Sequence, residues 1–154
     1  MISPEVLRRY PFFNKFSANT LKSVAMISEE VTFKQGEVIY ESGQPNAAVL
    51  LLESGCIESF LIVKDPNRPE VHKEYYLDDL DPGEVFGISA MVEEKVHTTT
   101  AQASRDGKLV RIDAAKLDAL CQEDPAFGYI LMKEMADTLL KRLQQDRIQL
   151  AACQ

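Results

Sequence analysis

The feature that most constrains the fold is a series of short β-rich segments in the middle of the chain, each followed by a turn signal. Within them apolar residues alternate with polar ones or form short β-branched runs, and glycines recur between them. Such strands are typical of a sandwich, a roll or a barrel. About eight are predicted, covering residues 31–33, 38–40, 47–52, 57–63, 71–77, 84–86, 98–103 and 109–112.

Helices are predicted on both sides of this region. Ser3 and Ser17 are N-cap residue types in front of short apolar stripes, which indicates two short N-terminal helices. Asp113 and Asp124 begin two further helices, and the last has no breaker beyond its first turn. We therefore predict a single domain over 1–154, mainly β with flanking helices, with a β-roll over about 29–112 and C-terminal helices over about 113–152.

The last helix carries apolar residues at alternating spacings of four and three, which is a heptad seam. This seam predicts a homodimer formed through the helix. The alternative is a helix that lies on its own β-roll through a second apolar face, which includes Tyr129, Ile130, Leu131, Met135 and Leu140, and both faces can be used together. The predicted seam consists of Met132, Ala136, Leu139, Leu143, Asp146 and Leu150.

Composition and net charge restrict the kinds of partner molecule that we expect. A chain of 154 residues with 45% hydrophobic residues can fill one core without disulfides or metals. The net charge of -7 disfavours phosphate backbones and anionic membranes, so we expect neither nucleic acid nor a membrane as a direct partner. The three cysteines are scattered, and the chain shows neither a signal-peptide pattern nor a membrane-spanning segment. These features together predict a cytoplasmic protein. No helix-turn-helix follows the long helix, which also argues against direct DNA binding.

Three stretches carry a resemblance to a known family. They cover residues 33–43, 50–55 and 80–87, and each combines an apolar run with a glycine turn. Together they resemble the cyclic-nucleotide-binding domain family, the sensor half of the catabolite activator protein superfamily, also found in kinase regulatory subunits and gated channels. The resemblance extends from about residue 10 to residue 143 and implies an antiparallel double-stranded β-helix, a jelly-roll-like β-roll.

The resemblance also implies a phosphate-binding cassette that begins at Phe86 and Gly87. In the family a glutamate follows and holds the ribose 2′-hydroxyl, and an arginine near the cassette's end pairs with the cyclic phosphate. Here Ile88 and His97 occupy those positions. A hydrogen bond to a charged group contributes about 1.5–3 kcal/mol, so losing two costs roughly two to four decades of affinity. We therefore expect no binding of cyclic AMP or cyclic GMP in the usual way.

Other groups could still hold a small anionic or nucleotide-like ligand. Backbone N–H groups of Ser89 and Ala90 should open a short helix that Ser89 can cap. His97 could donate to a ligand, or it could be a half-exposed strand histidine beside solvent-facing threonines. Ile88 could line the pocket or fill it. The predicted ligand-binding residues are Phe86, Gly87, Ile88, Ser89, Ala90, His97, Thr98, Thr99 and, on the long helix, Thr138.

Two functions remain open at this point: a ligand sensor with an altered cassette, and a ligand-free dimerisation or docking module on the same scaffold. A cupin-like enzyme is the rival from another class, but it needs several histidines around a metal. The chain has only His72 and His97, so a three-histidine site cannot be built. We expect no enzyme activity, no metal and no cofactor.

Overall fold

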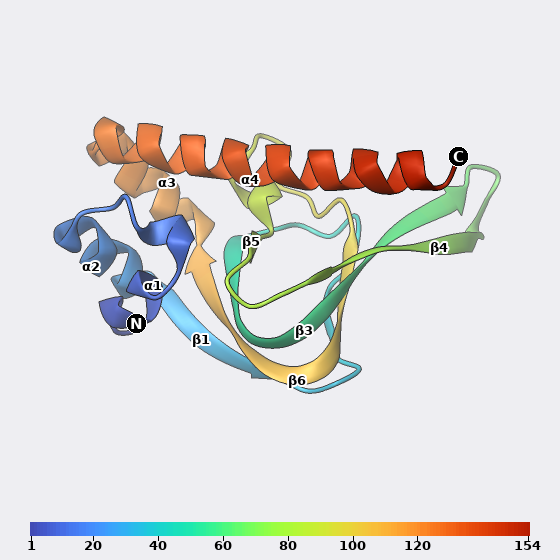
Figure 1. Ribbon diagram of the computed structural model, residues 1–154, viewed down its shortest axis with the longest axis horizontal. Coiled ribbons are helices and arrows are strands. Elements are labelled where there is room, and N and C mark those ends of the chain that lie inside the picture. Colours follow the sequence, from blue (N-terminus) through green and yellow to red (C-terminus); the bar gives the residue numbers. More distant parts are fainter.

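The computed structural model describes residues 1–154 (Figure 1). Its N-terminal part consists of three short helices. Ser3 Oγ accepts a hydrogen bond from the Glu5 N–H at 3.3 Å, and Ser17 Oγ accepts one from the Thr20 N–H at 3.2 Å, so both predicted N-caps are confirmed. The helices are α1 (Pro4–Arg8), the 3-10 helix η1 (Pro11–Phe13) and α2 (Ala18–Met26).

The central part is one antiparallel sheet that bends back on itself. Its strand order is β1-β6-β3-β4, with β2 paired to β6 and β5 paired to β3. This arrangement confirms the predicted mainly β fold class. The expected eight short strands are wrong in number, because β3 and β6 run through two of the predicted breaks. The strands are β1 (Ser28–Phe33), β2 (Val38–Tyr40), β3 (Ala48–Asp65), β4 (Arg68–Leu80), β5 (Val85–Phe86) and β6 (Thr100–Asp113).

The predicted hinge at the middle of β3 is a bulge. The register of β3 against β6 shifts on both sides of Ser54, so the strands bend sharply there without separating (Figure 1). Gly107 in β6 allows the close approach, because a Cβ at this position would lie 2.1 Å from the Ser54 carbonyl oxygen. The bend lets β3 and β6 contribute to both walls of the roll.

Two apolar clusters stabilise the domain: the inner cluster lies inside the roll, and the outer cluster lies under the helices. Alternation along β3 places Leu50 and Leu52 in the inner cluster and Val49 and Leu51 in the outer one. The outer cluster also contains Leu131 of the last helix. Since both faces of this strand are covered, its first five residues are all buried.

The chain ends in α3 (Ala114–Glu123) and the 28-residue α4 (Pro125–Ala152). Asp113 and Asp124 accept hydrogen bonds from backbone N–H groups of the helices they precede, as predicted. Of the predicted second apolar face, Leu131 and Met135 are buried, whereas Tyr129 and Leu140 are exposed. The C-terminal half of α4 extends beside the β3–β4 hairpin (Figure 1). None of the helices is long and apolar enough to cross a membrane.

Candidate functional site

The segment between β5 and β6 begins as the cassette pattern predicts. Gly87 has a left-handed backbone with φ of 70°, and it precedes the 3-10 helix η2 (Ile88–Met91). A Cβ on Gly87 would lie 3.2 Å from the Ala48 carbonyl oxygen. Glycine is therefore favoured here both by the left-handed backbone and by the close packing against Ala48. The predicted cap by Ser89 is wrong, because no side chain caps η2.

Asn46 is the residue that fixes the start of the cassette. Its Nδ2 donates to the Gly87 carbonyl oxygen at 2.8 Å and to Ser89 Oγ at 3.0 Å. Its Oδ1 accepts the Ala48 N–H at 3.2 Å. Asn46 was not among the residues predicted from the sequence. A polar side chain directly in front of the apolar run of β3 was the available signal, since buried amides need such partners.

Ile88, at the position of the family's glutamate, is buried and packs in the outer cluster with Leu131 and Met135. Its side chain thus belongs to the same apolar cluster as the first half of α4. Ile88 also lines the cleft described below, to which it contributes only hydrocarbon.

His97 is not the half-exposed strand histidine considered above, because its side chain is buried and lies before β6 begins. Its ring stacks on Tyr40 with centroids 3.8 Å apart, and Tyr40 in turn lies 6.2 Å from Phe86. Burial lowers the pKa of His97, so its imidazole is neutral at neutral pH. The group at the arginine position therefore offers no positive charge to a phosphate.

A cleft of about 200 Å³ lies between the cassette, the end of β4 and α4. Two predicted residues lie outside it. Ala90 is buried in the outer cluster, and Thr138 donates to the Glu134 carbonyl oxygen at 2.9 Å and lines a separate depression. The predicted residues that the cleft brings together are Phe86, Gly87, Ile88, Ser89, His97, Thr98 and Thr99.

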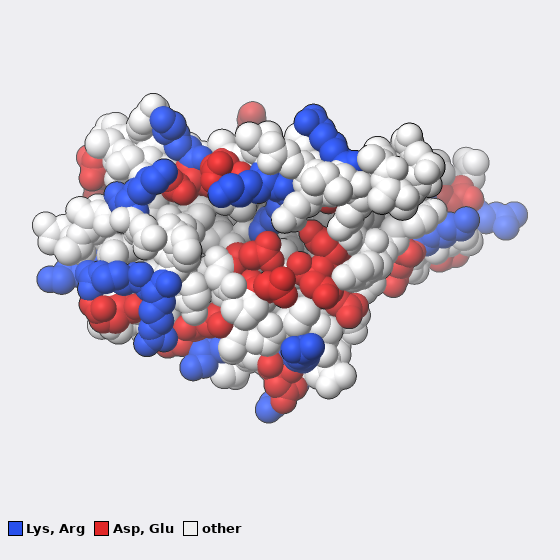
Figure 2. All heavy atoms as spheres, in the orientation of Figure 1, with Lys and Arg blue, Asp and Glu red and all other residues white.

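The charged groups of the cleft are residues that were not predicted as ligand-binding, since β4 was not assigned to the site and Thr138 was the only residue of α4 that was. Asp78 on β4 and Asp146 on α4 line it, and Arg142 is its one positively charged side chain. The Arg142 guanidinium donates to the Val85 carbonyl oxygen. Burial raises the pKa of Asp78, Arg142 lowers it and Asp146 raises it further. Figure 2 shows acidic side chains gathered beneath α4, over the end of β4.

The α4 residues of the cleft follow one helical face, with Leu139, Arg142 and Asp146 spaced by three and four. Leu139 and Asp146 were predicted as residues of the dimer seam, whereas Arg142 was assigned to neither the seam nor the ligand site. Asp78 carried no comparable signal, because only the bend of the sheet brings β4 opposite α4.

The family model for the cyclic nucleotide-binding domain matches residues 30–124. The chain belongs to the cyclic nucleotide-binding domain family. This match confirms both the resemblance and the β-roll fold inferred from it.

Solved structures agree with this assignment. A proposed cyclic nucleotide-binding protein from Geobacter metallireducens GS-15 is 31% identical, with a TM-score of 0.78 over 93% of this chain and 99% of that one. The catabolite activator protein of Thermus thermophilus, at 22% identity, shares the fold with a TM-score of 0.69 over 93% of this chain and 62% of its own.

Curated relatives of this cyclic nucleotide-binding domain are regulatory or channel proteins. The cAMP-dependent protein kinase regulatory subunit of Dictyostelium discoideum is 26% identical over 64% of this chain and 29% of its own length. A cyclic nucleotide-gated potassium channel of Mesorhizobium japonicum is 23% identical over 84% of this chain and 33% of its own. The chain thus spans about a third or less of these relatives.

No group of three or more histidine, cysteine, aspartate or glutamate side chains is arranged to hold a metal ion. The three cysteines are unpaired. The expectations of no enzyme activity, no cofactor and a cytoplasmic location stay predictions, as does the single domain over 1–154.

Proposed function

We propose that this cyclic nucleotide-binding domain is a regulatory sensor whose cleft does not take cyclic AMP or cyclic GMP in the usual way. The observation that carries the proposal is the charge of the cleft. Two carboxylates, from Asp78 and Asp146, line it beside a single arginine. A cyclic phosphate would enter a site with more negative than positive charge.

None of the available groups compensates for this excess. The Arg142 guanidinium is already engaged with the Val85 carbonyl oxygen. His97 is neutral and stacked on Tyr40, and Ile88 offers only hydrocarbon. Like charges placed together without a counter-ion are unfavourable, and more so where water is excluded.

The same charges favour the base and sugar of a nucleotide-like ligand over a small anion. Carboxylates accept hydrogen bonds from N–H and O–H groups, which a base and a sugar carry. The named ligands of the relatives support a nucleotide-like molecule at this place in the fold. The predicted small anion is the weaker alternative.

Thermal unfolding tests the proposal with cyclic AMP, cyclic GMP, cyclic dinucleotides and uncharged nucleosides, each at millimolar concentration. A ligand at about 100 times its dissociation constant adds about 2.7 kcal/mol of stability. We expect no shift from the two cyclic mononucleotides, and a clear shift from either would refute the proposal. No shift from any compound would favour the ligand-free docking module.

We also propose that α4 pairs with a second copy of the chain. The predicted seam residues are all exposed in the single chain, and Leu139 and Leu143 are 48% and 44% accessible. Their heptad spacing is self-complementary, which favours a second copy over an unrelated partner. Leu139 also lines the cleft, so a ligand there would contact the proposed dimer seam and could shift its equilibrium.

A further inference from the structure

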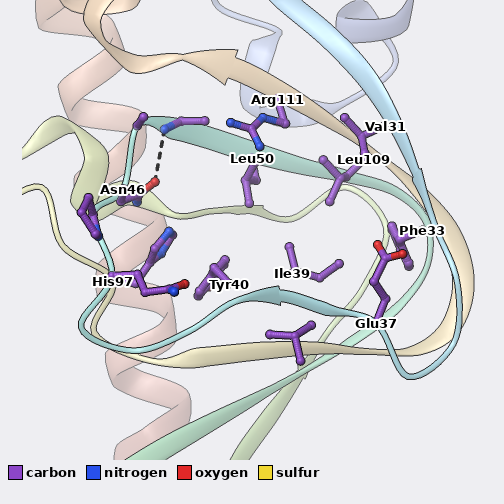
Figure 3. A pocket seen from close by; sticks show the side chains of 15 residues that line it. Val31, Phe33, Glu37, Ile39, Tyr40, Asn46, Leu50, His97, Leu109 and Arg111 are labelled. Carbon is purple, nitrogen blue, oxygen red and sulfur yellow. Dashed lines mark hydrogen bonds between the residues drawn. The ribbon is translucent and has the colours of Figure 1, made fainter.

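A second and larger hollow, of about 380 Å³, opens between β1 and β2 on the other side of the Tyr40–His97 stack (Figure 3). Tyr40 and His97 line both this hollow and the cleft, and therefore separate them. Its volume falls in the range of about 300–1,000 Å³ that is usual for small-molecule sites. Nothing in the proposed function of the cleft uses it.

The floor of the hollow is hydrocarbon from four strands. Val31, Ile39, Leu50 and Leu109 come from β1, β2, β3 and β6 respectively, and all point into it (Figure 3). This convergence follows from the inward alternation of each strand. An apolar body of a ligand would therefore be covered on several sides.

Arg111 brings a positive charge to this apolar space. Its guanidinium lies beside Leu50 in Figure 3, whereas the Glu37 carboxylate lies at the far end, beside Phe33. Its Nε is 3.6 Å from Glu29 Oε1, and the guanidinium makes no hydrogen bond within the chain. Its terminal nitrogens are thus free to bind a carboxylate through two parallel hydrogen bonds.

The Glu37 carboxylate at the far end is the one other charged group, and the remaining polar side chains around the hollow are already engaged or uncharged. Asn46 uses both Nδ2 and Oδ1 within the chain, and Gln44 Oε1 accepts the Glu41 N–H at 3.3 Å. His97 is neutral. Arg111 is therefore the one group that would attract an anionic ligand, at the end of the hollow away from Glu37.

We propose that the hollow between β1 and β2 binds a small apolar monocarboxylate, with its carboxylate on Arg111 and its hydrocarbon part among Ile39, Leu50 and Leu109. The site communicates with the cassette by direct contact. Tyr40 and His97 form the shared wall, and Asn46 joins the hollow to Gly87. A ligand in the hollow therefore touches the groups that hold the cassette.

The test is an NMR titration of the full chain with millimolar benzoate or phenylacetate. We expect concentration-dependent shifts of the methyl signals of Val31, Ile39, Leu50 and Leu109. Arg111→Gln should weaken binding about ten- to one-hundred-fold, which corresponds to one lost charged hydrogen-bonding partner. Arg105→Gln is the matched control, because Arg105 lies on the same strand, is exposed and lines neither site.

A second variant and an uncharged ligand test the proposal independently of Arg111→Gln. Ile39→Phe fills the hollow without touching Arg111, and should also abolish binding. Benzamide has the same ring without the negative charge and should bind far more weakly. Absence of shifts at the four methyl groups would overturn the proposal, as would equal binding to the Arg111→Gln variant or equal binding of benzamide. The cleft test with nucleotides is separate, since neither Arg111 nor Ile39 lines the cleft.

Discussion

The imidazole of His97 lies flat on the phenol ring of Tyr40, with 3.8 Å between the ring centroids and 8° between their planes. His97, which the family resemblance aligns with a phosphate-binding arginine, is thus used here for packing. Tyr40 also contacts Phe86 at the start of the cassette. Tyr40 and His97 form the wall between the cleft and the hollow between β1 and β2 (Figure 3), and Phe86 lines the cleft side alone.

We predict that acid destabilises the folded protein because His97 is buried in this stack. Burial lowers the pKa of this histidine below its usual 6.5, so the unfolded chain binds a proton before the folded one does. Its contribution to stability is therefore present above about pH 6.5 and is lost as pH falls towards the folded pKa. His97→Phe keeps the stacking and should remove this component, which urea unfolding at several pH values would detect.

His97→Ala is the matched variant, because it removes the stack as well as the charge. It should cost about 1–3 kcal/mol at neutral pH, whereas His97→Phe should stay within about 1 kcal/mol of the wild type. Equal losses in the two variants would show that the ring packing contributes little.

We predict that Glu53 gives the stability of the folded protein a pH dependence of the opposite sign to that from His97. Its Oε2 is buried without a hydrogen-bond partner. Burial and then the Glu30 carboxylate raise the pKa of Glu53 to about 7, from the usual 4.5. Between these values the folded protein holds a proton that the unfolded chain has released, so stability falls as pH rises through this window. Glu53→Gln should therefore unfold at higher urea concentration than the wild type at about pH 8, with a smaller difference at about pH 5.

Glu70→Gln is the control for this measurement, because Glu70 is exposed on the β3–β4 hairpin. It should leave the pH profile unchanged. If Glu53→Gln behaves in the same way, the carboxylate pair does not store a proton in the folded state.

The cassette itself was visible in the sequence because glycine turns and apolar runs are local patterns. The continuous β3 and β6 were not, since the bulge opposite Gly107 depends on two strands far apart in the chain meeting closely. The same limit applies to the cleft. Asp78 and Arg142 become neighbours only through the packing of α4 over the sheet, whereas Gly87 and Ile88 could be placed from adjacent residues.

Gly87 should tolerate alanine poorly. Its left-handed backbone costs about 1–2 kcal/mol for a residue with a Cβ, and the added carbon would press on the Ala48 carbonyl oxygen at 3.2 Å. Gly43 has the same kind of backbone, with φ of 88°, but no atom within 4 Å of the added carbon. Urea unfolding should therefore show a larger loss for Gly87→Ala than for Gly43→Ala. Equal losses would mean that packing against Ala48 is relaxed in solution.

The proposed dimer depends on the seam face of α4. Leu143→Asp places a charge in that seam, so light scattering after size-exclusion chromatography should show a monomer where the wild type is a dimer. Ile148→Asp is the matched control, because Ile148 is 70% accessible on the same helix but lies outside the heptad seam. A wild-type monomer would contradict the proposal, and dissociation by both variants would place the contact on another face.

The proposed function predicts that the cleft carboxylates are the main barrier to cyclic nucleotides. Asp78→Asn combined with Asp146→Asn removes both negative charges and leaves Arg142 in place. We expect weak cyclic AMP binding, measured by NMR titration at millimolar concentration, to strengthen at least about ten-fold, which corresponds to about 1.4 kcal/mol. Neutral adenosine should gain much less, because charge repulsion acts on the phosphate alone. No gain for cyclic AMP would assign the barrier to Ile88, whose buried side chain cannot reproduce the hydrogen bond of a glutamate to the ribose.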